Sequence, residues 1–320
     1  MLLPEADQPE EPPMIVPKAA NLPRMIQYVG LPLLALVVWD VCIVVAYKVL
    51  HWEWVGSRNV PLALYGSAIG IIVGFRNNSA YARWWEARGL WGQIVNNSRS
   101  FARQVFSTLR PDHIESEHDE DELLTTRHTL IYHQIAYVHA LRQQLRGLDP
   151  FPEIHGLIPE AEYQSLALQK NVALALQRNM GTIVRNARQR GWIDNLEWQA
   201  MDKNLDDLAD AQGGTERIKN TPMPKQYDFF PMLFVQIYCI LLPIGMVEQL
   251  GWFTPLGSTL VGFMFLTLDK IGRDLEDPFD NEIYDVPLTS ITRTIEINLR
   301  QILGETELPP PVTPERGVLW

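Results

Sequence analysis

The chain has little cysteine and carries none of the short motifs that usually mark an enzyme. Of its 320 residues only Cys42 and Cys239 are cysteines, and both stand inside apolar stretches. A cysteine in such a place is typical of a small buried residue, so we expect no disulfide framework. The sequence also lacks a glycine-rich phosphate loop, a nucleophile elbow and a spaced set of cysteines and histidines. We therefore expect neither an enzyme nor a bound cofactor.

The histidines do not form a convincing metal site either. His128, His133 and His139 are five and six residues apart, so no two of them share a ligand face of a helix. The histidines and acids between positions 113 and 122 could chelate a cation, but their spacing matches no compact site. A solvated acidic loop is the interpretation we favour for this segment.

Strand-like alternation and tandem repeats are absent too, whereas helical periodicity is common. Apolar residues recur at helical spacing over 91–109, 123–145, 159–169, 170–190 and 196–211. Four long apolar blocks stand beside these charged segments, at about 28–47, 60–75, 229–247 and 253–268. The block at 60–75 is slightly short for a lone membrane-spanning helix. The sequence predicts an all-α membrane protein with four transmembrane helices in two hairpins and a helical cytosolic domain.

One carboxylate lies within the first apolar block. Asp40 stands in the middle of 28–47. An ionisable group at that depth usually faces the interior of a bundle or a polar partner. We interpret Asp40 as a hydrogen-bonding residue in helix packing, with a functional role as the alternative.

Basic residues predict the orientation in the membrane. The loop 51–59 carries only Arg58, and the loop 248–252 carries no lysine or arginine. Arginines follow one another closely after Phe75, and Lys270 and Arg273 follow the last block. Because cytoplasmic loops carry the excess of basic residues, both short loops should lie outside and both termini in the cytosol. The acidic, proline-rich start of the chain argues against a cleavable signal peptide.

These features divide the chain into five expected parts. They are a disordered tail at 1–22, a first transmembrane hairpin at 23–75, a cytosolic helical domain at 76–226, a second hairpin at 227–268, and a cytosolic C-terminal segment and tail at 269–320.

Three motifs occur in an order that is informative as a set. They are Gly74-Phe75-Arg76-Asn77-Asn78-Ser79 with its continuation to Gly92, the segment Gly213-Gly214-Thr215-Glu216-Arg217-Ile218, and Glu276-Asp277-Pro278-Phe279. With these motifs the chain from about 23 to 304 resembles the bestrophin family, specifically its bacterial branch. The resemblance implies a homopentameric ion channel in the bacterial inner membrane, whose second transmembrane helix lines a narrow neck and whose cytosolic helices enclose a vestibule. The bilayer, permeant inorganic ions and four further copies of the chain are then its expected partners.

The resemblance also implies where the pore is narrow. The neck positions of the family fall on Ser67, Ile71 and Phe75, and the second, cytosolic aperture falls on Leu196. From spacing alone, Ser67, Ile71 and Phe75 share one helical face, which without the resemblance would fit a helix-packing surface. The family more often has a bulky apolar residue at the first position, so Ser67 should leave one ring of the neck wider and more polar.

Charge selectivity is open between two alternatives. Eukaryotic members of the family conduct chloride and similar anions, whereas part of the bacterial branch favours monovalent cations. A net charge of −11 per chain, with Glu197 beside the aperture, favours cations in the vestibule. Arg76 follows the neck and would form a basic ring if its guanidinium faced the lumen. On family grounds we expect conduction of chloride and other small anions. A sodium or potassium channel of the same fold is the alternative, and a membrane enzyme using the acids of 274–285 is a weaker one.

Those acids raise the question of a metal. Acidic residues are dense from 274 to 285, and carboxylates suit calcium. In animal relatives the matching segment is a calcium clasp, but here Ile283 and Tyr284 interrupt the acidic run. We interpret the acids as helix caps and partners of arginines from 83–103 or from a neighbouring subunit, and expect no metal. The clasp-like acids are Asp274, Asp277, Glu282 and Asp285.

Overall fold

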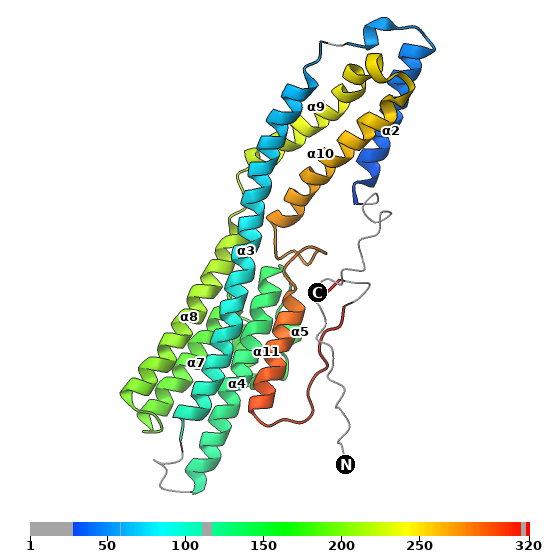
Figure 1. Ribbon diagram of the computed structural model, residues 1–320. Coiled ribbons are helices and arrows are strands. Elements are labelled where there is room, and N and C mark those ends of the chain that lie inside the picture. The colour runs from blue at the N-terminus through cyan, green and yellow to red at the C-terminus, as the bar shows by residue number, and fades with distance from the viewer. Residues whose placement is uncertain (1–27, 58, 111–116, 315–317) are drawn as a thin grey trace, which may run out of the picture. The chain divides into compact units, whose positions relative to one another are not determined.

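The computed structural model describes residues 28–57, 59–110, 117–314 and 318–320, and these are mostly helical (Figure 1). The expected all-helical class is confirmed. The expected tail at 1–22 lies outside the described residues, as do His113 and Glu115. The helices are α2 (Gly30–Lys48), η2 (Glu53–Val55), α3 (Leu62–Thr108), α4 (Glu117–Leu145), α5 (Phe151–Ile154), α6 (Glu160–Leu166), α7 (Val172–Gln189), α8 (Asn195–Asn220), α9 (Lys225–Leu250), η4 (Gly251–Phe253), α10 (Thr254–Glu276) and α11 (Leu288–Ile302).

The chain divides into two compact units. Of the described residues, one unit, the α9 unit, contains 28–57, 59–88 and 217–278, and the other, the α4 unit, contains 89–110, 117–216, 279–314 and 318–320. The α9 unit therefore contains all four apolar blocks of the sequence. The long helices α3 and α8 each contribute to both units.

Two apolar clusters hold the α9 unit together. The helices α2, α9 and α10 pack against one another (Figure 1). Leu36, Val73, Val235 and Cys239 form one buried cluster. Ile43, Val44, Val55 and Val247 form the other. Both cysteines are free, as the sequence indicates, although Cys42 is exposed in the single chain rather than buried.

Asp40 has the packing role that the sequence favours. Its side chain is fully buried. Its two carboxylate oxygens accept hydrogen bonds from Ser258 Oγ at 2.8 Å and Thr259 Oγ1 at 3.0 Å, both on α10. The carboxylate therefore ties α2 to α10 in the middle of the bundle, where an unpaired polar group would be costly.

Two stretches of the described chain are long and apolar enough to cross a membrane. They are Gly30–Lys48 and Lys225–Glu276. The second, of 52 residues, holds both α9 and α10, which are joined by η4 beginning at Gly251, where φ is +53°. The apolar start of α3 is not among them, consistent with its shortness in the sequence.

Helix α3 is longer than the sequence predicts. The change from apolar to charged residues after Phe75 indicated a boundary there and a separate helix at 91–109. The structure instead continues one helix of 47 residues from Leu62 to Thr108. The boundary between the α9 unit and the α4 unit falls after Arg88. The turns of α3 that follow Phe75 belong to the α9 unit because they still hydrogen-bond to α10 and to the end of α8. A change in polarity marks a change of surroundings here and not the end of a helix.

The α4 unit is organised around α4, which contacts α5, α7 and α11. This helix begins at Glu117 and not at 123, so part of the expected acidic loop belongs to the helix. Buried polar side chains pair inside the unit. His139 Nε2 lies 3.1 Å from Glu296, and Arg142 lies 2.6 Å from Glu153. The neighbouring His139 and Arg142 lower the pKa of Glu153 to about 2 despite its partial burial.

Candidate pore residues and their surroundings

The first half of α3 has two different faces. Val73, Arg76 and Ala80 lie on a face that the α9 unit buries completely or almost completely. Ile71 and Phe75, one turn apart, are 60% and 68% exposed. Because 3.6 residues make a turn, these two sets lie on opposite sides of the helix. The structure therefore leaves two large apolar side chains of the expected neck uncovered by their own chain.

Ser67 extends the exposed face by one turn. Its hydroxyl donates to the carbonyl of Leu64 at 3.0 Å, on its own helix. Behind it, the hydroxyl of Tyr238 on α9 donates to the carbonyl of Leu62 at 3.3 Å. A Cβ on Gly66 would lie 2.6 Å from that hydroxyl, so the glycine allows the close contact of α3 with α9.

Arg76 does not point in the direction that a basic pore ring requires. Its side chain is 1% exposed. The guanidinium donates from Nη1 to Asp269 Oδ1 at 2.9 Å and lies 3.5 Å from Asp228, and Nη2 donates to the carbonyl of Asp269. The buried carboxylate of Asp269 also pairs with Arg273 at 2.9 Å. Arg76 thus joins α3 to α9 and α10, and its charge is neutralised within the chain.

A glycine makes room for this guanidinium. A Cβ on Gly272 of α10 would lie 2.6 Å from Arg76 Nη2 and would overlap Asn77 Oδ1. Asn77 in turn donates to the carbonyl of Leu268 at 2.8 Å. The close approach of α3 and α10 therefore depends on a residue without a side chain at position 272.

Leu196 stands in the first turn of α8 with its side chain 75% exposed. A capping box fixes that turn: the backbone N–H of Glu197 donates to Asp194 Oδ1 at 2.7 Å, and the N–H of Asp194 donates to Glu197 Oε2 at 3.0 Å. Arg188 also donates to Asn195 Oδ1 at 2.6 Å. Glu197, which the sequence offered as a charge near the aperture, thus has a local structural role, and Leu196 is presented on a well-fixed turn.

The acids of 274–285 are distributed rather than gathered. Asp274 accepts a hydrogen bond from Tyr28, and Asp277 lies 3.9 Å from Arg83. Farther along, the N–H of Glu282 donates to Asp285 at 3.0 Å, and burial raises the pKa of Asp285 to about 6. Among the residues that the structure describes, no group of three or more histidine, cysteine or acidic side chains could hold a metal ion.

The sequence did not predict the role of Arg83. Its guanidinium donates from Nε to the carbonyl of Glu276 at 2.7 Å and from Nη1 to that of Thr221 at 2.7 Å, and Nη2 donates to the carbonyl of Ile218. One side chain of α3 therefore caps the C-terminal ends of both α8 and α10, where a cation is favourable. The sequence did contain one signal for this role: Arg83 follows Arg76 by seven residues, or two helical turns, so the two arginines lie on nearby parts of the same helix surface.

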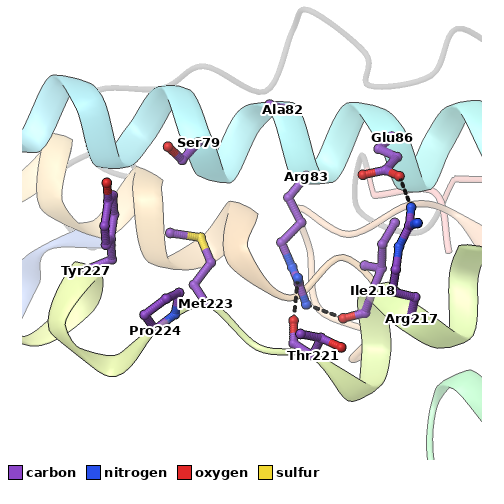
Figure 2. A pocket seen from close by; sticks show the side chains of 10 residues that line it. All are labelled: Ser79, Ala82, Arg83, Glu86, Arg217, Ile218, Thr221, Met223, Pro224 and Tyr227. Atoms are coloured by element: carbon purple, nitrogen blue, oxygen red, sulfur yellow. Dashed lines mark hydrogen bonds and ion pairs between the residues drawn. The ribbon is translucent and has the colours of Figure 1, made fainter.

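Arg83 also borders a cleft of about 620 Å³ in the α9 unit, which we call the α3 cleft (Figure 2). One wall comes from α3, and the other comes from the end of α8 and the start of α9. The lining residues are Ser79, Ala82, Arg83, Glu86, Arg217, Ile218, Thr221, Met223, Pro224 and Tyr227. The two walls of the cleft come from segments more than 130 residues apart in sequence, so no local sequence pattern could predict the cleft.

Comparison with known proteins supports the resemblance seen in the sequence. The family model described as Bacterial/Fungal Bestrophin protein matches residues 22–301. A voltage-dependent anion channel-forming protein of Ralstonia nicotianae is 34% identical over 273 residues, which are 83% of this chain and 86% of that protein. A protein of the same description from Salmonella typhi is 36% identical over 261 residues, 80% of each chain.

The fold is also that of solved structures. The crystal structure of a bacterial bestrophin homologue from Klebsiella pneumoniae is 30% identical, has a TM-score of 0.77, and covers 86% of this chain and 98% of its own. The fold and the sequence relationship thus extend over the α9 and α4 units alike. The protein is a membrane protein that belongs to the bacterial and fungal bestrophins, a channel-forming family and not an enzyme family.

Proposed function

We propose that the chain forms a homopentameric channel that conducts chloride and other small anions passively across the bacterial inner membrane. The observation that carries this proposal is the exposed face of α3, where Ile71 and Phe75 remain uncovered while the opposite face is packed into the α9 unit. An exposed apolar row on a membrane helix is covered either by lipid or by another helix. In a channel-forming family, copies of the same helix around a central axis would cover it.

The proposed span arrangement has four crossings. Helices α2, α9 and α10 supply three, and the first part of α3 supplies the fourth. The apolar part of α3 is short, but a helix surrounded by other helices need not match the bilayer as a lone helix must. The distribution of arginine and lysine supports an orientation with the short loops outside and both termini in the cytosol.

Two of the three neck rings, and the aperture, would then be apolar. Ser67, Ile71 and Phe75 would face the axis from α3, and Leu196 would form a second ring at the start of α8. Apolar rings restrict ion flow by excluding water, and the ring edge of Phe75 carries the positive part of the aromatic quadrupole, which favours a passing anion.

A monovalent cation channel is the second candidate. The chain carries −11 net charges, and Asp202, Asp206 and Asp210 lie exposed along α8, the helix that begins at Leu196. Such a field concentrates cations. The burial and pairing of Arg76 also removes the basic ring that would have opposed this effect. Anion conduction remains our proposal because related proteins at 34–36% identity are described as forming anion channels.

Reversal potentials separate the two candidates. The purified protein in a planar bilayer, with potassium chloride more concentrated on one side, should give a current that reverses near the chloride equilibrium potential. Reversal near the potassium equilibrium potential would overturn anion selectivity in favour of the cation channel. The absence of any current, with an intact oligomer confirmed by its mass in detergent, would contradict the channel itself.

A further inference from the structure

We propose that the α3 cleft is a binding site for small amphipathic monocarboxylates, that is, a carboxylate joined to an aromatic or branched aliphatic body. A cleft of about 620 Å³ is within the usual size range of small-molecule sites. Its lining combines one accessible guanidinium with an apolar wall, as such a ligand requires.

Arg217 is the group that would recognise the carboxylate. Its side chain is 66% exposed and makes an ion pair with Glu86 across the cleft (Figure 2). An ion pair between two exposed side chains contributes little free energy, so a ligand carboxylate can replace Glu86 as the partner of Arg217. The planar guanidinium can then donate hydrogen bonds to both ligand oxygens in a bidentate arrangement.

Arg83 lies between the two ends of the cleft and does not compete for the ligand (Figure 2). Its guanidinium donates hydrogen bonds to the carbonyls of Ile218, Thr221 and Glu276. These bonds hold the two walls of the cleft at their present separation. Together Arg83, Arg217 and Glu86 give the lining a net charge of one positive unit, which complements a monoanion.

The second wall suits the apolar body of the ligand. Ile218, Met223, Pro224 and Tyr227 line the cleft on the side of α8 and α9, and Tyr227 is exposed. Methionine adapts to ligands of different shape, and a tyrosine ring offers a flat apolar surface. Figure 2 shows the side chains of Met223, Pro224 and Tyr227 grouped at one end of the cleft, with the Arg217–Glu86 pair at the other. The polar and apolar ends thus match the two ends of a molecule such as 3-phenylpropionate.

The position of the cleft on α3 means that a bound ligand should affect the current. This expectation rests on the proposed channel function. Ser79, Ala82 and Glu86 follow Phe75 at intervals of four, three and four residues, so they continue the exposed face of α3. If Phe75 lines the neck, the cleft opens at the cytosolic end of the neck. A bound monocarboxylate would then reduce the current when it is added from the cytosolic side.

Binding can be measured without any current. Purified wild-type protein in detergent should bind radiolabelled 3-phenylpropionate saturably, whereas the neutral 3-phenylpropionamide should fail to compete for the site. Arg217→Gln should weaken binding about tenfold, because it removes a charge-assisted hydrogen bond. Glu86→Gln should tighten binding about threefold, because it removes the internal competitor of the ligand. A gain of affinity cannot result from misfolding.

Arg185→Gln is the matched control, since Arg185 is an exposed arginine of α7 outside the cleft. It should leave binding unchanged. Equal competition by the amide, equal binding by Arg217→Gln and wild type, or weaker binding by Glu86→Gln would overturn the site. If Glu86→Gln binds most tightly, wild type less tightly and Arg217→Gln most weakly, but the ligand has no effect on the current, the binding site would be supported and the assigned pore face contradicted. The two proposals can therefore fail separately.

Discussion

The two faces of α3 differ in what surrounds them. On one face Val73 and Arg76 are covered by α9 and α10, and the guanidinium of Arg76 meets the carboxylate of Asp269 in a buried pair. On the other face Ile71 and Phe75 are apolar, large and uncovered. The buried face thus carries a charge and the exposed face carries apolar groups, the reverse of a helix in a water-soluble protein. We infer that the first face holds the subunit together and that the second serves the assembly.

The largest expected effect is on the buried face. Arg76→Ala should lower the free energy of unfolding by about 3 kcal/mol, because it leaves Asp269 buried with only Arg273 as its ionic partner. The measurement is the unfolding midpoint of the purified protein in detergent. Arg185→Ala, on an exposed face of α7, is the control and should change the midpoint little. The double variant Arg76→Ala with Asp269→Ala should recover part of the loss, and a double variant less stable than the single one would argue against the pair as the cause.

The next largest effect is on the exposed face. Ile71→Ala should raise single-channel conductance severalfold, because a smaller side chain widens an apolar ring that excludes water. Recordings in planar bilayers at one salt concentration test this. Leu64→Ala is a control, since Leu64 is also exposed on α3 but lies outside the predicted neck. Unchanged conductance in Ile71→Ala would mean that the ring is not the narrowest part of the pore.

A smaller change is expected at the cytosolic aperture. Leu196→Ala should alter the relative permeability among ions of different size more than it alters open probability, because a narrow ring removes part of an ion's hydration shell. Bi-ionic reversal potentials give the ratios. Leu168→Ala, another highly exposed leucine of the α4 unit, should leave them as in the parent. Permeability ratios identical in the parent and in Leu196→Ala would count against this aperture.

Sequence reasoning found the apolar segments and the exposed positions more readily than the partners of the charges. Hydropathy alone located α2, α9 and α10, because long apolar runs have few alternatives to a membrane bundle. Hydropathy gave no direction for the Arg76 side chain, which the sequence offered as a pore charge only on the condition that its guanidinium faced the lumen. One face of the helix carries Val73, Arg76 and Ala80. That spacing indicates that the Arg76 side chain faces the core. The position of Asp269 beside Arg76, 193 residues away, depends on the packing of α3 against α10 and could not be read from either segment.

No effect at all is expected from micromolar calcium. Glu282 and Asp285 are joined by a local hydrogen bond, and Ile283 and Tyr284 between them offer only backbone carbonyls to a cation. Currents should be the same with and without a calcium chelator, in the wild type and in Glu282→Gln. A reversible loss of current on chelation that Glu282→Gln reproduces would show that the segment is a working sensor.

The most direct test of the account asks whether the exposed face of α3 meets the ion pathway. In a background with Cys42→Ser and Cys239→Ala, Ile71→Cys and Val73→Cys place single thiols two residues apart on the two faces. A charged, water-soluble methanethiosulfonate should change the current through Ile71→Cys channels and leave Val73→Cys channels unaffected. Modification that changes the current at Val73→Cys but not at Ile71→Cys would contradict the assignment of the pore to this face.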